Sequence, residues 1–174
     1  MKSIKIVSFI CMLVLFSAFS LTVTSVPSNG NTIYVDDDAP PEWYDETHVQ
    51  TIQEGIDIAS DGDTVYVYSG IYLENVNVDK SINLIGEEKD TTIIDGGEND
   101  HVVLISKDLV LISEFTMRNS SSGIYLNQFA NQVTLSDNLI HNNQYIAIHA
   151  PFSDTMNLVI SNNKIISNYF GIIS

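Results

Sequence analysis

Two pairs of side chains that could take part in chemistry have the same spacing in the second half of the chain. Arg118 and His141 lie 23 positions apart, and so do Glu114 and Asp137. If the chain winds into coils of that length, such pairs stack about 5 Å apart on one face. Calcium prefers carboxylate oxygens as ligands, so Glu114 and Asp137 are a candidate calcium site. The alternative is a surface ion pair between Arg118 and Glu114.

A second group of calcium candidates lies in the oxygen-rich stretch 95–100 (DGGEND), where Asp95 and Asp100 supply carboxylates. The stretch lacks the spacing of an EF-hand loop, and a solvated acidic corner is the alternative. The acidic run 36–38 (DDD) has the same two interpretations. The four histidines are scattered and support neither a copper nor a zinc site. Calcium is therefore the one cofactor that the residues suggest.

Two tyrosines offer flat rings near the first pair of polar residues. The apolar face of a sugar can pack on an aromatic ring while polar side chains bond its hydroxyls. Tyr125 and Tyr145, together with Arg118 and His141, are therefore candidate carbohydrate-binding residues. The alternative is that the rings only cover a hydrophobic core. No catalytic residue is predicted.

The elements that would position these side chains are short strands. After Gly62 the apolar residues alternate in runs of three to five, bounded by Gly, Asn, Asp or Ser, which is typical of short β-strands. The runs repeat along the chain: 78–85 matches 105–112 at an offset of 27, 110–113 matches 133–136 at 23, and 133–138 matches 158–163 at 25. Two apolar columns follow from these offsets: Met117, Ile140 and Ile165, and Tyr125, Ile148 and Ile173.

A repeat of about 25 residues built from strands and Asn-rich corners predicts a β-solenoid, in which backbone groups pair between coils. The fold class is therefore all-β, a right-handed parallel β-helix. Residues 51–54 (TIQE) form a capping box, which predicts a helix over 51–60 that covers the N-terminal end. The last residues stop within a coil, so the C-terminal end is expected to be open. It either continues in a longer protein or associates end to end with another chain.

The N-terminal residues predict export. Lys2 and Lys5 precede an apolar run and small residues, which is the pattern of a signal peptide. We therefore divide the chain into a signal peptide (1–25), an N-terminal strand, acidic loop and capping helix (30–62), and β-helix coils (63–174). Cys11, the only cysteine, falls within the signal segment. No stable membrane span is expected once that segment is cleaved.

The charge of the chain limits its partners. The net charge of −15 becomes −17 when Lys2 and Lys5 are removed with the signal segment. A surface this acidic repels phosphate backbones and anionic lipid headgroups. Nucleic acid is therefore excluded as a partner, and polysaccharide or cell-envelope glycans are the expected ones.

Several segments resemble a known family. They are 51–57 (TIQEGID), 61–65 (DGDTV), 70–76 (GIYLENV), 84–87 (LIGE) and 91–96 (TTIIDG). These segments are similar to the N-terminal region of pectin-lyase-like β-helix proteins. The similarity is strongest to the NosD-type group and to the carbohydrate-binding and sugar-hydrolysis (CASH) domains with their PbH1 repeats. The run 36–41 (DDDAPP) resembles archaeal surface proteins with these repeats. The resemblance implies the fold, and a fold does not identify a reaction.

Two functions are consistent with the resemblance. The first is an exported, cell-surface or secreted β-helix with a non-catalytic carbohydrate-binding, adhesive or scaffold role. The alternative is a polysaccharide lyase or hydrolase, because lyases of this fold use acidic ladders for calcium beside an Arg or Lys base. The signature of the pectin methylesterases, which the N-terminal segments also resemble, is absent. The non-catalytic function is therefore preferred.

Overall fold

The computed structural model describes residues 30–98, 100–152 and 157–174. The predicted signal peptide (1–25) lies outside the described residues. The described chain is built almost entirely from short strands, with one 3-10 turn, η1 (Pro41–Trp43), and one α-helix, α1 (Ile52–Ile58). None of the helices described combines the length and apolar character that crossing a membrane requires.

The strands form three parallel sheets. The first sheet contains β2 (His48–Val49), β1 (Thr32–Val35), β3 (Thr64–Val67), β6 (Asn83–Gly86), β9 (Leu111–Ser113), β12 (Val133–Ser136) and β15 (Leu158–Ser161). The second contains β4 (Gly70–Tyr72), β7 (Thr92–Asp95), β10 (Thr116–Arg118), β13 (Leu139–His141) and β16 (Lys164–Ile166). The third contains β5 (Val76–Val78), β8 (His101–Ile105), β11 (Ser122–Leu126), β14 (Ile146–His149) and β17 (Phe170–Ile173).

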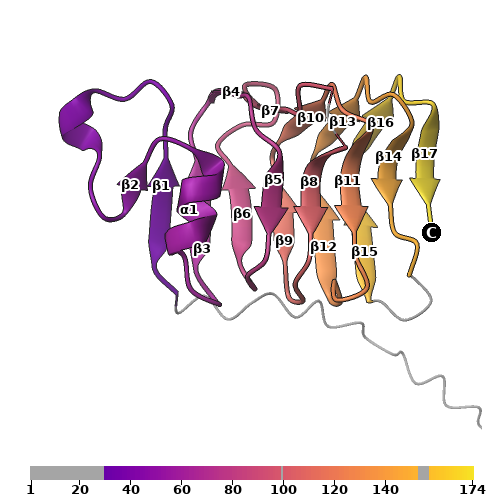
Figure 1. Cartoon of the computed structure of the whole chain (residues 1–174), viewed down its shortest axis with the longest axis horizontal. Helices are drawn as coiled ribbons and strands as arrows, with labels where there is room; N and C mark the ends of the chain where they lie inside the picture. The colour runs from indigo at the N-terminus through magenta and orange to yellow at the C-terminus, as the bar shows by residue number, and fades with distance from the viewer. Residues whose placement is uncertain (1–29, 99, 153–156) are drawn as a thin grey trace, which may run out of the picture.

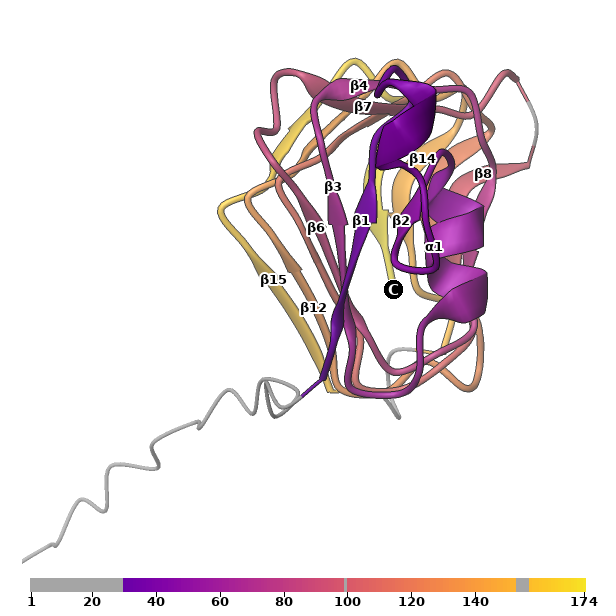
Figure 2. The same ribbon diagram turned by 90° about the vertical axis from the view of Figure 1, so that its left-hand side faces the viewer.

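From β3 onward each coil of the chain contributes one strand to each sheet in turn, and the coils stack along the long axis (Figure 1). Viewed from the N-terminal end, the three sheets are the walls of a tube (Figure 2). From β6 to β14, every strand therefore pairs with the corresponding strand of the preceding coil and of the following coil. This confirms the predicted parallel β-helix.

The alternation of each strand sends one side chain into the tube and the next one out. On the first sheet, Val65, Leu84, Ile112 and Leu135 are paired in sequence and completely buried. Their neighbours on the outer face include Tyr66, which is only half-buried. Since burying one such aliphatic side chain stabilises a fold by about 1.5–3 kcal/mol, these inward columns supply the main driving force for coiling.

The sequence alignment of the coils was wrong by one residue in two places. Val78 pairs with Ile105, at the predicted offset of 27, but Leu84 pairs with Ile112 at an offset of 28. The extra residue is accommodated at the corner before β9, where Leu109 adopts a left-handed φ of 55°. Such a corner can absorb an insertion without disturbing the pairing of the strands on either side.

The second error concerns the column assigned to Tyr125. Tyr125 pairs with His149, which in turn pairs with Ile173, whereas Ile148 pairs with Ile124. Because side chains alternate between the two faces, a shift of one residue reverses the side on which they lie. Tyr125 and His149 therefore face outward together, and Ile148 is completely buried.

Two asparagine ladders hold the Asn-rich corners that the sequence shows. Asn138 is completely buried, and its Oδ1 accepts a hydrogen bond from the Phe115 N–H of the preceding coil. Its Nδ2 donates to the Ile112 carbonyl and to Asn163 Oδ1 of the following coil. Asn143 and Asn168 repeat this arrangement at the next corner. These side chains satisfy backbone groups that the bend of the chain leaves without strand partners.

Helix α1 lies beside β3 and β5 at the N-terminal end (Figure 1). Its predicted capping box is present, because the Thr51 side chain accepts from the Glu54 N–H and Glu54 reaches back to the Thr51 N–H. Ile52 and Ile56 are completely buried against the first coil. A Cβ on Gly55 would lie 2.9 Å from a Val35 methyl, so glycine allows this close approach.

Polar contacts fix α1 at both ends of its exposed side. The Glu74 carboxylate accepts from the Ile52 and Gln53 N–H groups, at 2.9 and 3.0 Å. The Gln53 side-chain amide accepts from the Asn77 N–H of β5. Lys80 Nζ donates to the Asp57 and Ala59 carbonyls near the end of the helix. The side chain of Gln53 thus bonds a backbone group on the edge of the third sheet.

Replacing Asn138 tests the role of the ladder. In Asn138→Ala, the Phe115 N–H and the Ile112 carbonyl lose their partners inside the tube, so we expect the free energy of unfolding to fall by about 2–3 kcal/mol. Chemical denaturation monitored by circular dichroism measures this. Gln128→Ala, which removes an exposed side-chain amide, is the control and should change stability by less than about 0.5 kcal/mol. Equal effects of the two substitutions would refute the assigned role.

The pKa of Glu74 gives a pH-dependent prediction. Burial raises this pKa above its usual 4.5, and the hydrogen bonds from Gln53 and Ile52 only partly oppose the rise. Just above pH 4.5, the folded chain therefore retains a proton that the unfolded chain has released, so this residue makes stability fall as pH rises. In Glu74→Gln, which cannot titrate, we expect stability relative to wild type to increase as the pH is raised from 4 to 7. Denaturation at several pH values checks the direction, and a constant or decreasing difference would contradict it.

Candidate functional site

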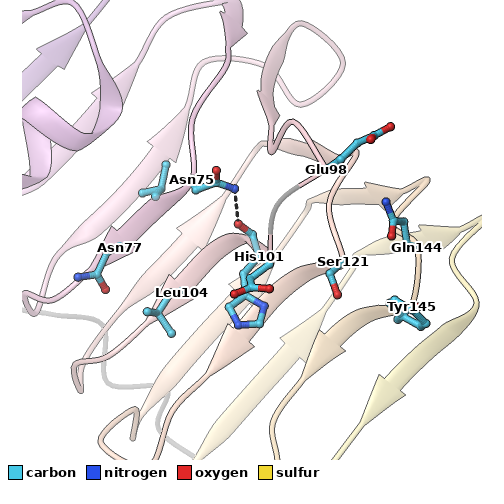
Figure 3. Close-up of a pocket in the computed structure, with 10 residues that line it drawn as sticks. Asn75, Asn77, Glu98, His101, Leu104, Ser121, Gln144 and Tyr145 are labelled. Carbon is cyan, nitrogen blue, oxygen red and sulfur yellow. Dashed lines mark hydrogen bonds between the residues drawn. The ribbon is translucent and has the colours of Figure 1, made fainter.

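A groove runs across the outer face of the third sheet. It encloses about 680 Å³ and crosses four neighbouring coils. Figure 3 shows its residues along these strands, from Asn77 and Leu104 on one side to Gln144 and Tyr145 on the other, with His101 between them. The lining comprises Asn75, Val76, Asn77, Glu98, Asp100, His101, Leu104, Ser121, Gln144 and Tyr145.

Stacked rings border this groove. The rings of His101 and Tyr125 are nearly parallel, at 13°, with their centres 4.5 Å apart. The ring of His149 meets Tyr125 edge to face at 5.1 Å. Tyr145, which lies just before β14, lines the groove and is 57% exposed. The outer face therefore presents an aromatic surface that continues from one coil to the next.

His101 lies at the centre of the groove and is partly buried. Its Nδ1 is buried and has no hydrogen-bond partner among the described residues, while its backbone carbonyl accepts from Asn75 Nδ2 at 2.6 Å (Figure 3). Burial lowers the pKa of its imidazole below 6.5, and the opposing effect of Asp100 does not restore it. A histidine with a lowered pKa is uncharged at neutral pH.

The structure divides the four predicted carbohydrate-binding residues between two walls. Tyr125 and Tyr145 belong to the third sheet, where Tyr145 lines the groove and Tyr125 stacks beside it. Arg118 and His141 are paired on β10 and β13 of the second sheet, as their spacing predicted. These two residues do not line the groove. The polar residues that line the groove in their place are His101 and the side-chain amides of Asn75, Asn77 and Gln144. These residues share no regular spacing that the sequence could reveal.

Arg118 is occupied by another partner. Its Nε lies 2.9 Å from Asp95 Oδ2, and Asn119 Nδ2 donates to the same oxygen at 2.7 Å. Burial alone would raise the pKa of Asp95, but the hydrogen bonds from Arg118 and Asn119 outweigh it and the pKa lies below the usual value. The Asp95 carboxylate is therefore part of a structural ion pair on the second wall.

The four predicted calcium ligands occupy three separate places. Glu114 and Asp137 lie at the same corner of successive coils, with left-handed φ values of 63° and 58°. Asp95 pairs with Arg118, and Asp100 lines the groove. Among the described residues, the one group of three or more carboxylate, histidine or cysteine ligands that come within 4.8 Å of one another is Asp36, Asp37 and Asp38.

A second cluster of aromatic rings lies at the N-terminal end of the described chain. The ring of Trp43 lies 4.6 Å from His48 and 6.0 Å from Tyr68, and Tyr34 stacks on His48 at 5.1 Å. The contacts of Trp43, which are edge to face, attach the loop that contains η1 to the outer face of the first sheet. We therefore assign this cluster a structural role.

Comparison with known proteins agrees with the fold. No curated protein sequence matches the chain. Among solved structures, an alginate lyase from Paenibacillus sp. str. FPU-7 is similar, with a TM-score of 0.52 and 15% sequence identity. The similarity covers 80% of this chain and 61% of the lyase chain. At this identity the likeness shows that the two proteins share the β-helix fold, and it does not identify a reaction of this chain.

A protein-family model provides the closer assignment. The model described as periplasmic copper-binding protein (NosD) matches residues 27–174, which is nearly the whole chain. The match includes all the strands of the three walls. The chain therefore belongs to the NosD family of periplasmic β-helix proteins.

Proposed function

We propose that this protein binds a carbohydrate chain along the outer face of its third sheet and does not cleave it. The observation that carries the proposal is the stack of His101, Tyr125 and His149 beside a groove that Tyr145 also lines. The C–H groups on the apolar face of a sugar can pack on an aromatic ring, and the exposed ring of Tyr145 beside the partly buried stack offers such a surface. The spacing of stacked coils then offers one binding position after another.

Polar groups of the groove complete the proposed site. The Gln144 side chain is exposed at the rim, and Asn77 contributes a side-chain amide on β5. Glu98 and Asp100 supply carboxylate oxygens that can accept from sugar hydroxyls. At the centre of the groove, β8 is paired with β5 on one side and with β11 on the other. This part of the site is therefore largely pre-formed, as binding grooves usually are.

The proposal places the protein outside the cytoplasm, at the cell surface or in the secreted fraction. The family is described as periplasmic, and the basic and apolar residues at the N-terminus have the pattern of an export signal. The strongly negative net charge also suits a surface exposed to cations and hydrated polymers. Cell-envelope glycans are accordingly the expected partners.

Neither copper nor calcium is part of the proposal. Copper is bound by imidazole, thiolate and thioether groups, whereas the one dense ligand group in the described part of the chain, Asp36 to Asp38, is entirely carboxylate. The ring of Tyr125 contacts both His101 and His149, and these two histidines belong to no such ligand group among the described residues. The described residues therefore do not fit copper, and the separated calcium candidates form no single calcium site.

Removing the exposed ring of the groove tests the binding site. We expect Tyr145→Ala to weaken binding to an immobilised polysaccharide about five- to tenfold, because one stacking contact of roughly 1 kcal/mol or more is lost. Binding is measured on a panel of neutral glucans, mannans and xylans together with alginate and polygalacturonate. Phe129→Ala is the matched control, because Phe129 is 65% exposed and does not line the groove.

Several results would contradict the proposal. Failure of the wild-type protein to bind any polysaccharide of the panel would remove the proposed function. Equal weakening by Phe129→Ala would show that the groove is not the site. Release of reducing ends, or of unsaturated sugar that absorbs in the ultraviolet, would replace binding by the hydrolase or lyase alternative.

A further inference from the structure

We infer that the groove on the third sheet selects neutral glycans and rejects polyuronates. The inference rests on the proposed function and adds the chemical class of the ligand. It follows from the charges that line the groove: among the residues described, the lining contains carboxylates and neither lysine nor arginine. The lyase that shares the fold acts, by its name, on alginate, which is a polyuronate.

In the part of the chain that the structure describes, the rim of the groove carries negative charge and its lining has no lysine or arginine. Glu98 and Asp100 are exposed acidic side chains that line it. Arg118, on the neighbouring wall, is paired with Asp95 and is not among the residues that line the groove. A carboxylate placed about 4 Å from another is repelled by roughly 1 kcal/mol in water and more near a protein surface. A polyuronate would bring one such charge with every sugar.

His101 does not reverse this balance. Of the described residues that line the groove, it is the one that could become cationic near neutral pH. Because burial favours its neutral form, it presents an uncharged imidazole to the groove. The protein as a whole adds to the repulsion, because its net charge is −15.

The same carboxylates favour a neutral sugar. A hydroxyl group donates a hydrogen bond to a carboxylate oxygen, and such charge-assisted bonds are about twice as strong as neutral ones. Figure 3 shows Glu98, Gln144 and Tyr145 around the same part of the groove, where an amide and a ring accompany the carboxylate. This combination supplies a stacking surface, an acceptor and an amide, and each matches a group that a neutral hexose offers.

Binding is best compared between neutral and uronate polymers of similar length. Neutral glucan, mannan and xylan oligosaccharides and oligouronates are titrated at about 0.15 M salt, where the screening length is about 8 Å. One series contains a chelator and another contains calcium. We expect at least one neutral oligosaccharide to bind at least tenfold more tightly than any oligouronate in both series. Raising the salt concentration should strengthen only the weak uronate binding.

A pair of charge-neutralising variants separates the groove from the rest of the surface. The double substitution Glu98→Gln with Asp100→Asn should reduce the preference for the neutral sugar at least threefold. Glu88→Gln with Asp90→Asn removes the same two charges at the same spacing from an exposed corner outside the groove. This control should leave the preference unchanged, and circular dichroism verifies that both variants fold.

The outcomes distinguish this inference from the function on which it rests. Binding of no polysaccharide at all overturns the proposed function. If the protein binds glycans but binds oligouronates as tightly as neutral oligosaccharides, or more tightly, only the inferred selectivity is overturned. Uronate binding that appears only with calcium also overturns it, because calcium would then bridge the acidic rim and the ligand. An equal effect of the two double variants would show that general surface charge sets the preference.

Discussion

Parallel pairing between successive coils is the constraint on which the rest of the molecule depends. The strands are short, and a strand of three residues has no neighbour within its own coil that could satisfy its backbone groups. Each coil therefore uses the previous coil as the template for its position, and the register of that pairing decides which side chains enter the tube. Val65, Leu84, Ile112 and Leu135 form one inward column because their strands pair in register. On the outer face the same pairing aligns Tyr125 with His149.

The corners allow this register to survive a variable repeat length. Residues at equivalent corners, such as Glu114, Asp137 and Asn162, have left-handed φ values between 57° and 63°. A left-handed residue costs about 1–2 kcal/mol for most side chains, so each corner needs compensation. The buried amides of Asn138 and Asn143 provide it by bonding the backbone across coils. The offset between paired strands can therefore change from 19 to 28 residues while the walls stay aligned.

The outer faces carry the differences between proteins that share this architecture. In the described part of the chain, the inside of the tube is filled mainly by aliphatic side chains. The second wall uses its polar residues in the Arg118–Asp95 pair, and the first wall uses its rings to hold a loop. The third wall combines exposed rings, amides and carboxylates beside a groove. A shared fold with an alginate lyase therefore says little about the ligand, which depends on outward residues.

The amino-acid sequence determined the parallel β-helix, the capping box of Thr51 and Glu54 and the asparagine ladders, because these features depend on local patterns and on periodic spacing. It also placed Arg118 above His141 and Glu114 above Asp137, since no insertion separates those coils. The tertiary structure decided the true column of Tyr125, because one additional residue in that coil shifts the offset from 23 to 24. Only the tertiary structure brought His101 onto the ring of Tyr125. In the strand register His101 pairs with Ser122, and Tyr125 pairs with Leu104. The rings of His101 and Tyr125 therefore meet diagonally across two strands, and the spacing of the coils in the sequence does not predict such a contact.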